Sequence, residues 1–411
     1  MRKLLHIVLF ASIFSLNINA QISINDVLKE AKKGNVEAMY IAGDYYKKYE
    51  RDDNKAIEWY KKAADYGHKE SMFSIACYYF YGLGEITQDF SMSLEWFKKA
   101  ANEGHERAMF FTALLYRFGM GVDKDYAQAL EWYQKAAYKG NETAMYALGT
   151  LYENGLGTAQ DYSMAMKWYQ NAAAKGDAIA MCRIGELYEN GLGVAQDYST
   201  AMEWYQASAD RGEPIAMCGI GLLYENGNGV PQDYTLALLW YLRAADEENA
   251  AAMCGIGLLY ENGNGVPQDY SKSMEWYQKA ADKGNTDAKY NIGNLYYDGH
   301  GVQQDYAKAM EYYKGAEQLE HNPSINKIGE MYYNGYYVAE DREKAFELFT
   351  KAAMASQNPS GDAMKRLSDC YRFGYGTEQN LEQAEYWLMK AQEIGNDKAI
   401  SIKRLLDSEN Y

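Results

Sequence analysis

The sequence repeats itself every 36 residues over most of its length. Asp161, in the phrase LYENGLGTAQDY, has counterparts at this spacing: Asp89, Asp125, Asp197, Asp233, Asp269, Asp305 and Asp341. A tryptophan lies seven residues after six of these aspartates, at Trp96, Trp132, Trp168, Trp204, Trp240 and Trp276. Copies around Asp52 with Trp59, and around Asn380 with Trp387, bring the number of repeats to ten. A period in this range indicates a solenoid, in which each repeat packs mainly on its neighbours.

Each repeat contains two amphipathic helical patterns. After Asp161, the apolar residues have the spacing expected for one face of a helix; they are Ala165, Trp168, Tyr169, Ala172 and Ala173. This second helix of the repeat, helix B, is expected to end at Gly176. The first helix of the next repeat, helix A, is expected to begin after a capping residue of the kind found at Asn35, Asn141, Asp177, Asn285 and Asn396. We therefore predict an all-α solenoid of about ten antiparallel helix pairs.

The glycines and aspartates of the repeated phrase have structural roles in this prediction. Gly155 is placed to end helix A in a left-handed conformation, Gly157 to bend the loop, and Asp161 to cap helix B. A further glycine inside helix A, such as Gly185, costs about 1 kcal/mol relative to alanine. We expect it because helix B of the same repeat packs closely there. The phrase is thus predicted to turn the chain rather than to bind a metal.

The repeat unit resembles a known family. The pattern A-x-x-x-x-G-x-L-Y-x-x-G-x-G-V-x-x-D-Y-x-x-A-x-x-W-Y-x-x-A-A-x-x-G is similar to the Sel1-like repeat, a relative of the tetratricopeptide repeat, over nearly all of the chain after residue 20. The resemblance implies a right-handed superhelix and a role as an adaptor that holds other proteins. A secreted, cysteine-rich branch of the family has been linked to penicillin binding, which suggests an alternative: an enzyme that acts on cell-wall or β-lactam chemistry.

The ends of the chain differ from the repeats. Arg2 and Lys3 precede an apolar run that ends at Leu16, and the small residue Ala20 follows. Residues 1–20 are therefore predicted to be a cleaved signal peptide, because the apolar run is too short for a membrane anchor. We expect an exported protein, periplasmic or secreted, with no membrane segment after cleavage. Residues 21–34 and 396–411 are predicted to be capping helices that flank ten repeats over 35–395.

The charge of the chain restricts its partners. The formal net charge is -16 at pH 7. So acidic a chain repels nucleic acid and anionic membranes, and it attracts basic partners if it attracts charged ones.

The sequence holds no strong catalytic or metal-binding motif. His68 and His105 follow glycines and are expected to be exposed caps, and Cys182, Cys218 and Cys254 share one position, too far apart for a disulfide. The segment SINK, from Ser324 to Lys327, has the S-x-x-K spacing of penicillin-recognising enzymes but lacks their other elements. We predict no cofactor, no metal and no enzymatic activity.

The candidate binding surface consists of helix A positions that vary between repeats. Counting from the small residue Ala180 as zero, positions four, five, seven and eight recur and are expected to be buried. Position eight is a tyrosine in every repeat: Tyr46, Tyr79, Tyr116, Tyr152, Tyr188, Tyr224, Tyr260, Tyr296, Tyr332 and Tyr371. In related helical solenoids, helix A lines the concave face. Positions two, six and nine are therefore predicted to point into a groove.

Aromatic residues occupy these groove positions in the early and late repeats: Tyr40, Phe73, Phe80, Phe110, Tyr146, Tyr290, Tyr297 and Tyr333. The middle repeats combine an apolar floor, the three cysteines with Leu222 and Leu258, with an acidic edge of Glu153, Glu189, Glu225 and Glu261. We predict that the groove binds an extended or helical segment of another protein, with a preference for basic residues. The open alternative is that the aromatics only pack between helices and that the glutamates form a solvated edge.

Overall fold

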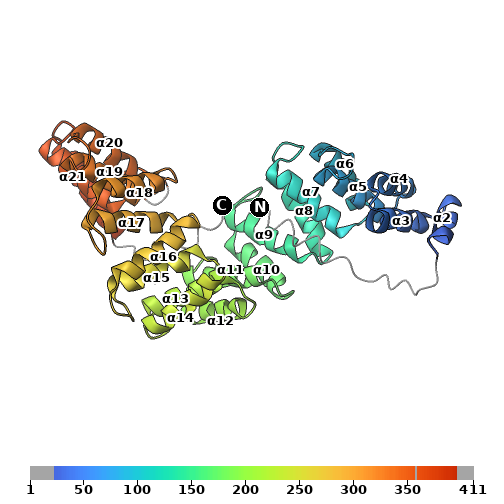
Figure 1. Ribbon diagram of the computed structural model, residues 1–411, viewed down its shortest axis with the longest axis horizontal. Helices are drawn as coiled ribbons and strands as arrows, with labels where there is room; N and C mark the ends of the chain where they lie inside the picture. The colour runs from blue at the N-terminus through green and yellow to red at the C-terminus, as the bar shows by residue number, and fades with distance from the viewer. Residues whose placement is uncertain (1–22, 357–358, 396–411) are drawn as a thin grey trace. The chain divides into compact units, whose positions relative to one another are not determined.

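The computed structural model describes residues 23–356 and 359–395, and within these ranges the secondary structure is entirely helical (Figure 1). The chain divides into two compact units, residues 1–177 and 178–411. In the first unit, α2 (Ile24–Lys32) precedes four helix pairs. The pairs are α3 (Val36–Tyr45) with α4 (Asp53–Ala64), α5 (Lys69–Tyr81) with α6 (Phe90–Asn102), α7 (Glu106–Phe118) with α8 (Tyr126–Tyr138), and α9 (Glu142–Asn154) with α10 (Tyr162–Ala173). A short π-helix, η1 (Tyr46–Glu50), follows α3.

The second unit contains six helix pairs. They are α11 (Ala178–Asn190) with α12 (Tyr198–Ala209), α13 (Pro214–Asn226) with α14 (Tyr234–Asp246), α15 (Ala250–Asn262) with α16 (Tyr270–Asp282), α17 (Thr286–Asp298) with α18 (Tyr306–Glu317), α19 (Asn322–Asn334) with α20 (Arg342–Ala353), and α21 (Gly361–Phe373) with α22 (Leu381–Gly395). In the second unit, each helix A packs against helix B of its own repeat, and the B helices α12, α14, α16, α18 and α20 pack against helix A of the following repeat. The predicted all-α fold of about ten helix pairs is confirmed, whereas the expected segments 1–20 and 396–411 lie outside the described residues.

The side chains that cap the helices are those that the repeat predicts. The aspartates of the 36-residue ladder cap helix B; Asp161, for example, accepts a hydrogen bond from the backbone N–H of Met164 at 2.9 Å. Asn35, Asn141 and Asn285 cap helix A in the same way. Gly155 and Gly157 both adopt a positive φ, of 64° and 73°, which a residue with a side chain rarely adopts. The repeated phrase therefore turns the chain between helices A and B.

The glycine inside helix A faces one particular side chain of helix B. A Cβ atom added to Gly185 would lie 2.7 Å from the ring of Tyr205, and one added to Gly257 would lie 2.5 Å from the ring of Tyr277. The predicted close approach of the two helices is thus confirmed. The ring that packs against helix A at this point belongs to the tyrosine directly after the tryptophan position of helix B. This tyrosine is almost completely buried in seven repeats, as Tyr60, Tyr133, Tyr169, Tyr205, Tyr241, Tyr277 and Tyr313.

The tyrosine that recurs in helix A behaves differently from the prediction. It was expected to be buried in every copy, but Tyr152, Tyr188 and their eight equivalents are only half-buried. The physical reason lies in the packing of the pair, because the glycine makes room for the ring of helix B at the centre of the repeat. The helix A ring is left at the margin of this contact and stays half-buried.

Candidate functional site

The aromatic residues at helix A position two pack against helix B of their own repeat. In five repeats the two ring centroids lie 5.5 to 5.9 Å apart: Tyr40 with Tyr60, Phe73 with Phe97, Phe110 with Tyr133, Tyr146 with Tyr169, and Tyr290 with Tyr313. Phe73 and Phe110 are each only 9% exposed, whereas the three tyrosines are half-buried. This position therefore contributes mainly to the core of the repeat, and its tyrosines add an accessible edge.

Phe80, at position nine of the second repeat, is also a core residue. It is 2% exposed, and its ring lies 5.4 Å from that of Phe90 and 5.7 Å from that of Phe111. Phe80 thus offers almost no surface to a partner.

The four glutamates at position nine each accept a hydrogen bond from a buried tyrosine. The hydroxyl groups of Tyr169, Tyr205, Tyr241 and Tyr277 donate at 2.5 Å to Glu153, Glu189, Glu225 and Glu261, respectively. Glu189, expected at an accessible acidic edge, is only 2% exposed, and the other three are half-buried. A buried hydroxyl without a partner is costly, so these carboxylates have a clear structural role.

Burial also changes the protonation of this row. It raises the pKa of Glu189 to about 7, although the hydrogen bond from Tyr205 acts in the opposite direction and the charge of Glu186 adds to the rise. Burial raises the pKa of Glu225 as well. The charge of these two carboxyl groups is therefore less available to a basic partner than their sequence pattern suggests.

Other repeats supply the acceptor from a different helix A position. The hydroxyl of Tyr60 donates to Asp44 at 2.5 Å, and that of Tyr313 donates to Asn294 at 2.8 Å. Both acceptors occupy position six of helix A. The acceptor for the buried tyrosine hydroxyl thus comes from position six in some repeats and from position nine in others. The sequence analysis did not predict this role for either position. The constant separation of 16 residues between each glutamate and its tyrosine was the available signal.

The apolar residues of the middle repeats belong to the core of the second unit. Cys182, Cys218 and Cys254 are each 1% exposed, Leu222 is 5% exposed, and Leu258 is half-buried. All five cysteines are free thiols. Burial raises the pKa of Cys182 and Cys254 well above the usual value, which disfavours the reactive thiolate.

The late tyrosines lie beside cationic side chains. Tyr290, Tyr297 and Tyr333 are half-buried on α17 and α19. The Lys327 ammonium group lies 5.0 Å from the ring centroid of Tyr297, and the Arg342 guanidinium lies 5.5 Å from that of Tyr333. Among the predicted groove residues, these tyrosines combine partial exposure with neighbouring cations, a combination that favours contact with a partner.

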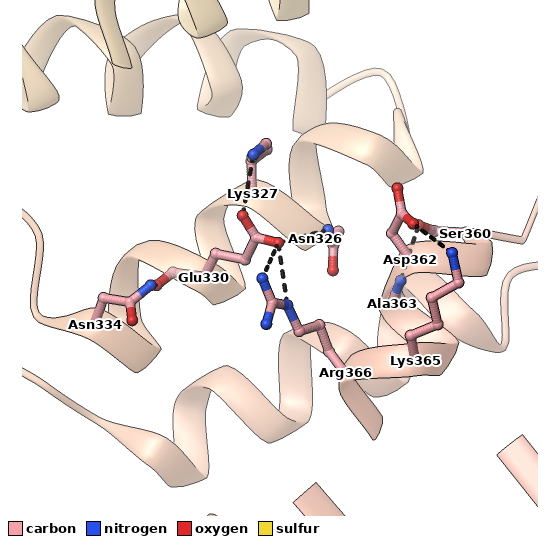
Figure 2. A network of polar contacts seen from close by, with 9 residues as sticks. All are labelled: Asn326, Lys327, Glu330, Asn334, Ser360, Asp362, Ala363, Lys365 and Arg366. Carbon is pink, nitrogen blue, oxygen red and sulfur yellow. Dashed lines mark hydrogen bonds and ion pairs between the residues drawn. The ribbon is translucent and has the colours of Figure 1, made fainter. Parts of the chain in front are cut away.

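A network of charged residues connects α19 to α21 (Figure 2). Glu330 accepts from Lys327 at 3.1 Å through one carboxylate oxygen, and from Nε and Nη2 of Arg366 at 3.2 and 3.1 Å through the other. Asn326 lies against the same carboxylate, with its Nδ2 atom 3.5 Å from Glu330. Burial would lower the pKa of Lys327, but Glu330 raises it above the usual value, so this lysine stays charged.

The histidines are caps that also connect successive repeats. His105 accepts from the backbone N–H of Ala108, and its Nε2 atom lies 2.8 Å from Glu70 of the preceding repeat. Because it is only 7% exposed, the expectation of a solvent-exposed cap is wrong for His105. The link to the preceding helix A places the ring inside the contact between repeats.

The Ser324 segment is explained by the same kind of connection. The Ser324 hydroxyl lies 2.8 Å from Nδ1 of His321, whose Nε2 lies 3.0 Å from Asp287, and His68 has an equivalent arrangement with Ser71 and Glu37. Ser324 is completely buried, and Lys327 pairs with Glu330. A serine with no exposed surface cannot reach a substrate, so the S-x-x-K spacing has a structural explanation.

Within residues 23–356 and 359–395, no group of three or more histidine, cysteine, aspartate or glutamate residues could hold a metal ion, and no helix combines the length and apolar character needed to cross a membrane.

Comparison with known proteins identifies the repeat. The model of the Sel1 repeat matches residues 36–68, 69–105, 106–141, 143–177, 178–213, 214–249, 250–285, 286–320, 323–356 and 361–396. A crystal structure of c5321, a protective antigen of uropathogenic Escherichia coli with an SLR fold, is 25% identical with a TM-score of 0.61, covering 95% of this chain and 91% of that one. A Sel1 repeat protein from Oxalobacter formigenes is also 25% identical with a TM-score of 0.62, covering 76% and 92%. A search of curated proteins gave no match. With ten matched repeats covering most of its length, the chain belongs to the Sel1 repeat family.

Proposed function

We propose that this protein is a non-enzymatic scaffold that binds another protein or a peptide through the exposed parts of its A helices. Sel1 repeat solenoids generally mediate protein–protein interactions, and their structural neighbours are typically scaffolds without catalytic activity. The observation that carries the proposal is the row of half-buried tyrosines on α17 and α19, next to Lys327 and Arg342. Aromatic rings held beside cations are frequent anchors in protein interfaces.

The proposed binding surface is narrower than the whole set of variable positions. Phe73, Phe80 and Phe110 are buried, and the glutamates of the middle repeats are engaged by tyrosines. The surface that we propose is therefore centred on Tyr290, Tyr297 and Tyr333 of the second unit. Because Tyr290 packs against Tyr313, it supports the surface while Tyr297 and Tyr333 are better placed to make contact.

Affinity capture from cell-envelope extracts tests this proposal. We expect a variant with Tyr297→Ala and Tyr333→Ala to retain at least about tenfold less of the partner than the unmodified chain, since removal of two anchor rings weakens an interface by several kcal/mol. The matched control replaces Tyr66 and Tyr138, which are 66% and 79% exposed in the first unit, with alanine. Circular dichroism must show that all three proteins are folded. Equal retention by the two double variants would contradict the proposed surface.

We also propose that the protein is exported, on the basis of its first twenty residues. Cleavage after Ala20 predicts that protein isolated from the envelope or the medium begins at Gln21. N-terminal sequencing of the protein from each cell fraction measures this. Protein that retains Met1 and stays with the cytoplasmic fraction would contradict export.

A further inference from the structure

We propose that Asn228 and Asn264 are sites of spontaneous deamidation, at which the folded protein converts two asparagines to aspartate or isoaspartate. The inference concerns the chemistry of the chain itself and does not depend on the proposed scaffold function. Its starting point is the phrase ENGNGVPQDY, which contains two asparagine–glycine pairs and occurs in two successive repeats. Asparagine is a chemically labile residue, and a following glycine leaves the backbone freest to react because it has no side chain.

The reaction needs only water in addition to the protein. The backbone nitrogen of Gly229 loses its proton to the solvent and attacks the Cγ atom of Asn228. The new C–N bond forms as the Cγ–Nδ2 bond breaks, and the amide nitrogen takes up a proton and leaves as ammonia. Water then opens the succinimide ring at either of its two carbonyl carbons. Each event thus consumes a water molecule, releases ammonia and replaces a neutral amide with a carboxylate.

Most asparagine–glycine pairs of the described residues lie at the ends of A helices, where the backbone nitrogen is engaged. The N–H group of the glycine donates to a carbonyl of its own helix at Gly155, Gly191, Gly227, Gly263 and Gly335. In four of these pairs the asparagine amide also donates to a helix carbonyl; Asn226, for example, donates to Leu222 at 3.0 Å. Attack at these sites requires the end of the helix to open first.

The second pair of the phrase is arranged differently. Among the described residues, the N–H groups of Gly229 and Gly265 have no hydrogen-bond acceptor, and the side-chain amides of Asn228 and Asn264 have no hydrogen-bond partner. Both glycines are exposed, so water reaches the reacting atoms. The nucleophile and its target are therefore available without the opening of a helix.

Exposure alone would give the opposite ranking. Asn226 and Asn262 are exposed, whereas Asn228 and Asn264 are half-buried. Both members of each phrase are followed by glycine and lie within a few residues of each other. A faster reaction at the second member therefore reports the hydrogen bonds of the folded chain, rather than the local sequence or the access of solvent.

The modified residue lies in the turn that joins α13 to α14. The N–H of Asn228 donates to Leu223 at 3.0 Å, and that of Asp233, which caps α14, donates to Tyr224 at 2.9 Å. Isoaspartate lengthens the backbone between these two hydrogen bonds by one carbon, whereas aspartate adds only charge. Conversion at both sites also lowers the formal net charge by two from -16.

Peptide mapping by mass spectrometry tests the inference. The full chain is incubated at mildly alkaline pH, with and without urea, and is digested at acidic pH, which suppresses the reaction. We expect Asn228 and Asn264 of the folded chain to react at least about tenfold faster than Asn226 and Asn262, whose glycine N–H groups must first leave their hydrogen bonds. In urea, where these hydrogen bonds are lost, the four rates should approach one another.

Two double variants provide a matched comparison. Asn228→Gln with Asn264→Gln should stop the appearance of more acidic forms of the folded protein in isoelectric focusing, because glutamine would have to close a six-membered ring, which forms much more slowly. Asn226→Gln with Asn262→Gln should leave the rate of acidification unchanged. Circular dichroism must show that both variants are folded.

Two outcomes would overturn the inference. Reaction at Asn226 and Asn262 as fast as at Asn228 and Asn264 in the folded chain would mean that the hydrogen bonds do not control the chemistry. Intact Asn228 and Asn264 in the folded chain, over a period in which both react in urea, would mean that the fold protects them. Neither outcome bears on the scaffold proposal, because its own test is the capture of a partner.

Discussion

Replacing Gly257 with alanine is expected to destabilise the second unit by about 3 kcal/mol, although alanine is the better helix former by about 1 kcal/mol. The added Cβ atom would lie 2.5 Å from the ring of Tyr277, which has no exposed surface and cannot move aside. Either the ring leaves its position, which breaks its hydrogen bond to Glu261, or α15 and α16 separate. Chemical denaturation of the full chain, followed by circular dichroism, measures the loss.

The matched control is Gly315→Ala in α18. Here the added Cβ atom would have only Lys289 nearby, with its Cδ atom at 3.9 Å, an ordinary van der Waals distance. We expect this substitution to stabilise the protein by about 0.5 to 1 kcal/mol, because only the helix propensity changes. Opposite signs for two identical substitutions would confirm that the helix A glycine is fixed by packing. A gain in stability at both positions would contradict the close contact between Gly257 and Tyr277.

The fold could be predicted from the sequence because the repeat presents the same local signals ten times. Asp161 and its equivalents mark where helix B begins, and Gly155 and its equivalents mark where helix A ends. Each signal acts within a few residues of its own position, through a cap or a left-handed backbone, so no knowledge of tertiary contacts is needed. Their regular spacing then leaves a stack of helix pairs as the only consistent arrangement.

The candidate site was harder to predict because its properties depend on contacts between helices. Because position nine of helix A varies between repeats, the sequence suggested that its residues are free to contact a partner. In the structure, however, Glu189 at this position accepts the hydrogen bond of the buried Tyr205 hydroxyl. Where position nine lacks a carboxylate, Asp44 or Asn294 provides the acceptor from position six. A pattern of hydrophobicity cannot distinguish a carboxylate that faces solvent from one that satisfies a buried donor. The same limit concealed the network around Glu330, whose two cations are 39 residues apart in the sequence.

The buried row of tyrosines and glutamates makes the stability of the protein depend on pH. The pKa of Glu189 is raised from 4.5 to about 7 by burial, so the folded state holds a proton that the unfolded chain releases. The contribution of Glu189 to the free energy of unfolding is therefore fully present below about pH 4.5, and it is lost as the pH rises through 7. A shift of this size corresponds to about 3 kcal/mol. Glu225, whose pKa burial also raises, acts in the same direction.

Glu189→Gln is expected to remove this dependence. The glutamine still accepts the hydrogen bond from Tyr205, but it carries no charge to be buried. Relative to the unmodified protein, the variant should gain about 2 to 3 kcal/mol in unfolding free energy between pH 5 and pH 8. The control Glu131→Gln alters a 52% exposed carboxylate paired with Lys135 on α8, and its stability should run parallel to that of the unmodified protein. Parallel curves for Glu189→Gln as well would mean that Glu189 is ionised in the folded state at neutral pH, and that its hydrogen bond with Tyr205 compensates for its burial.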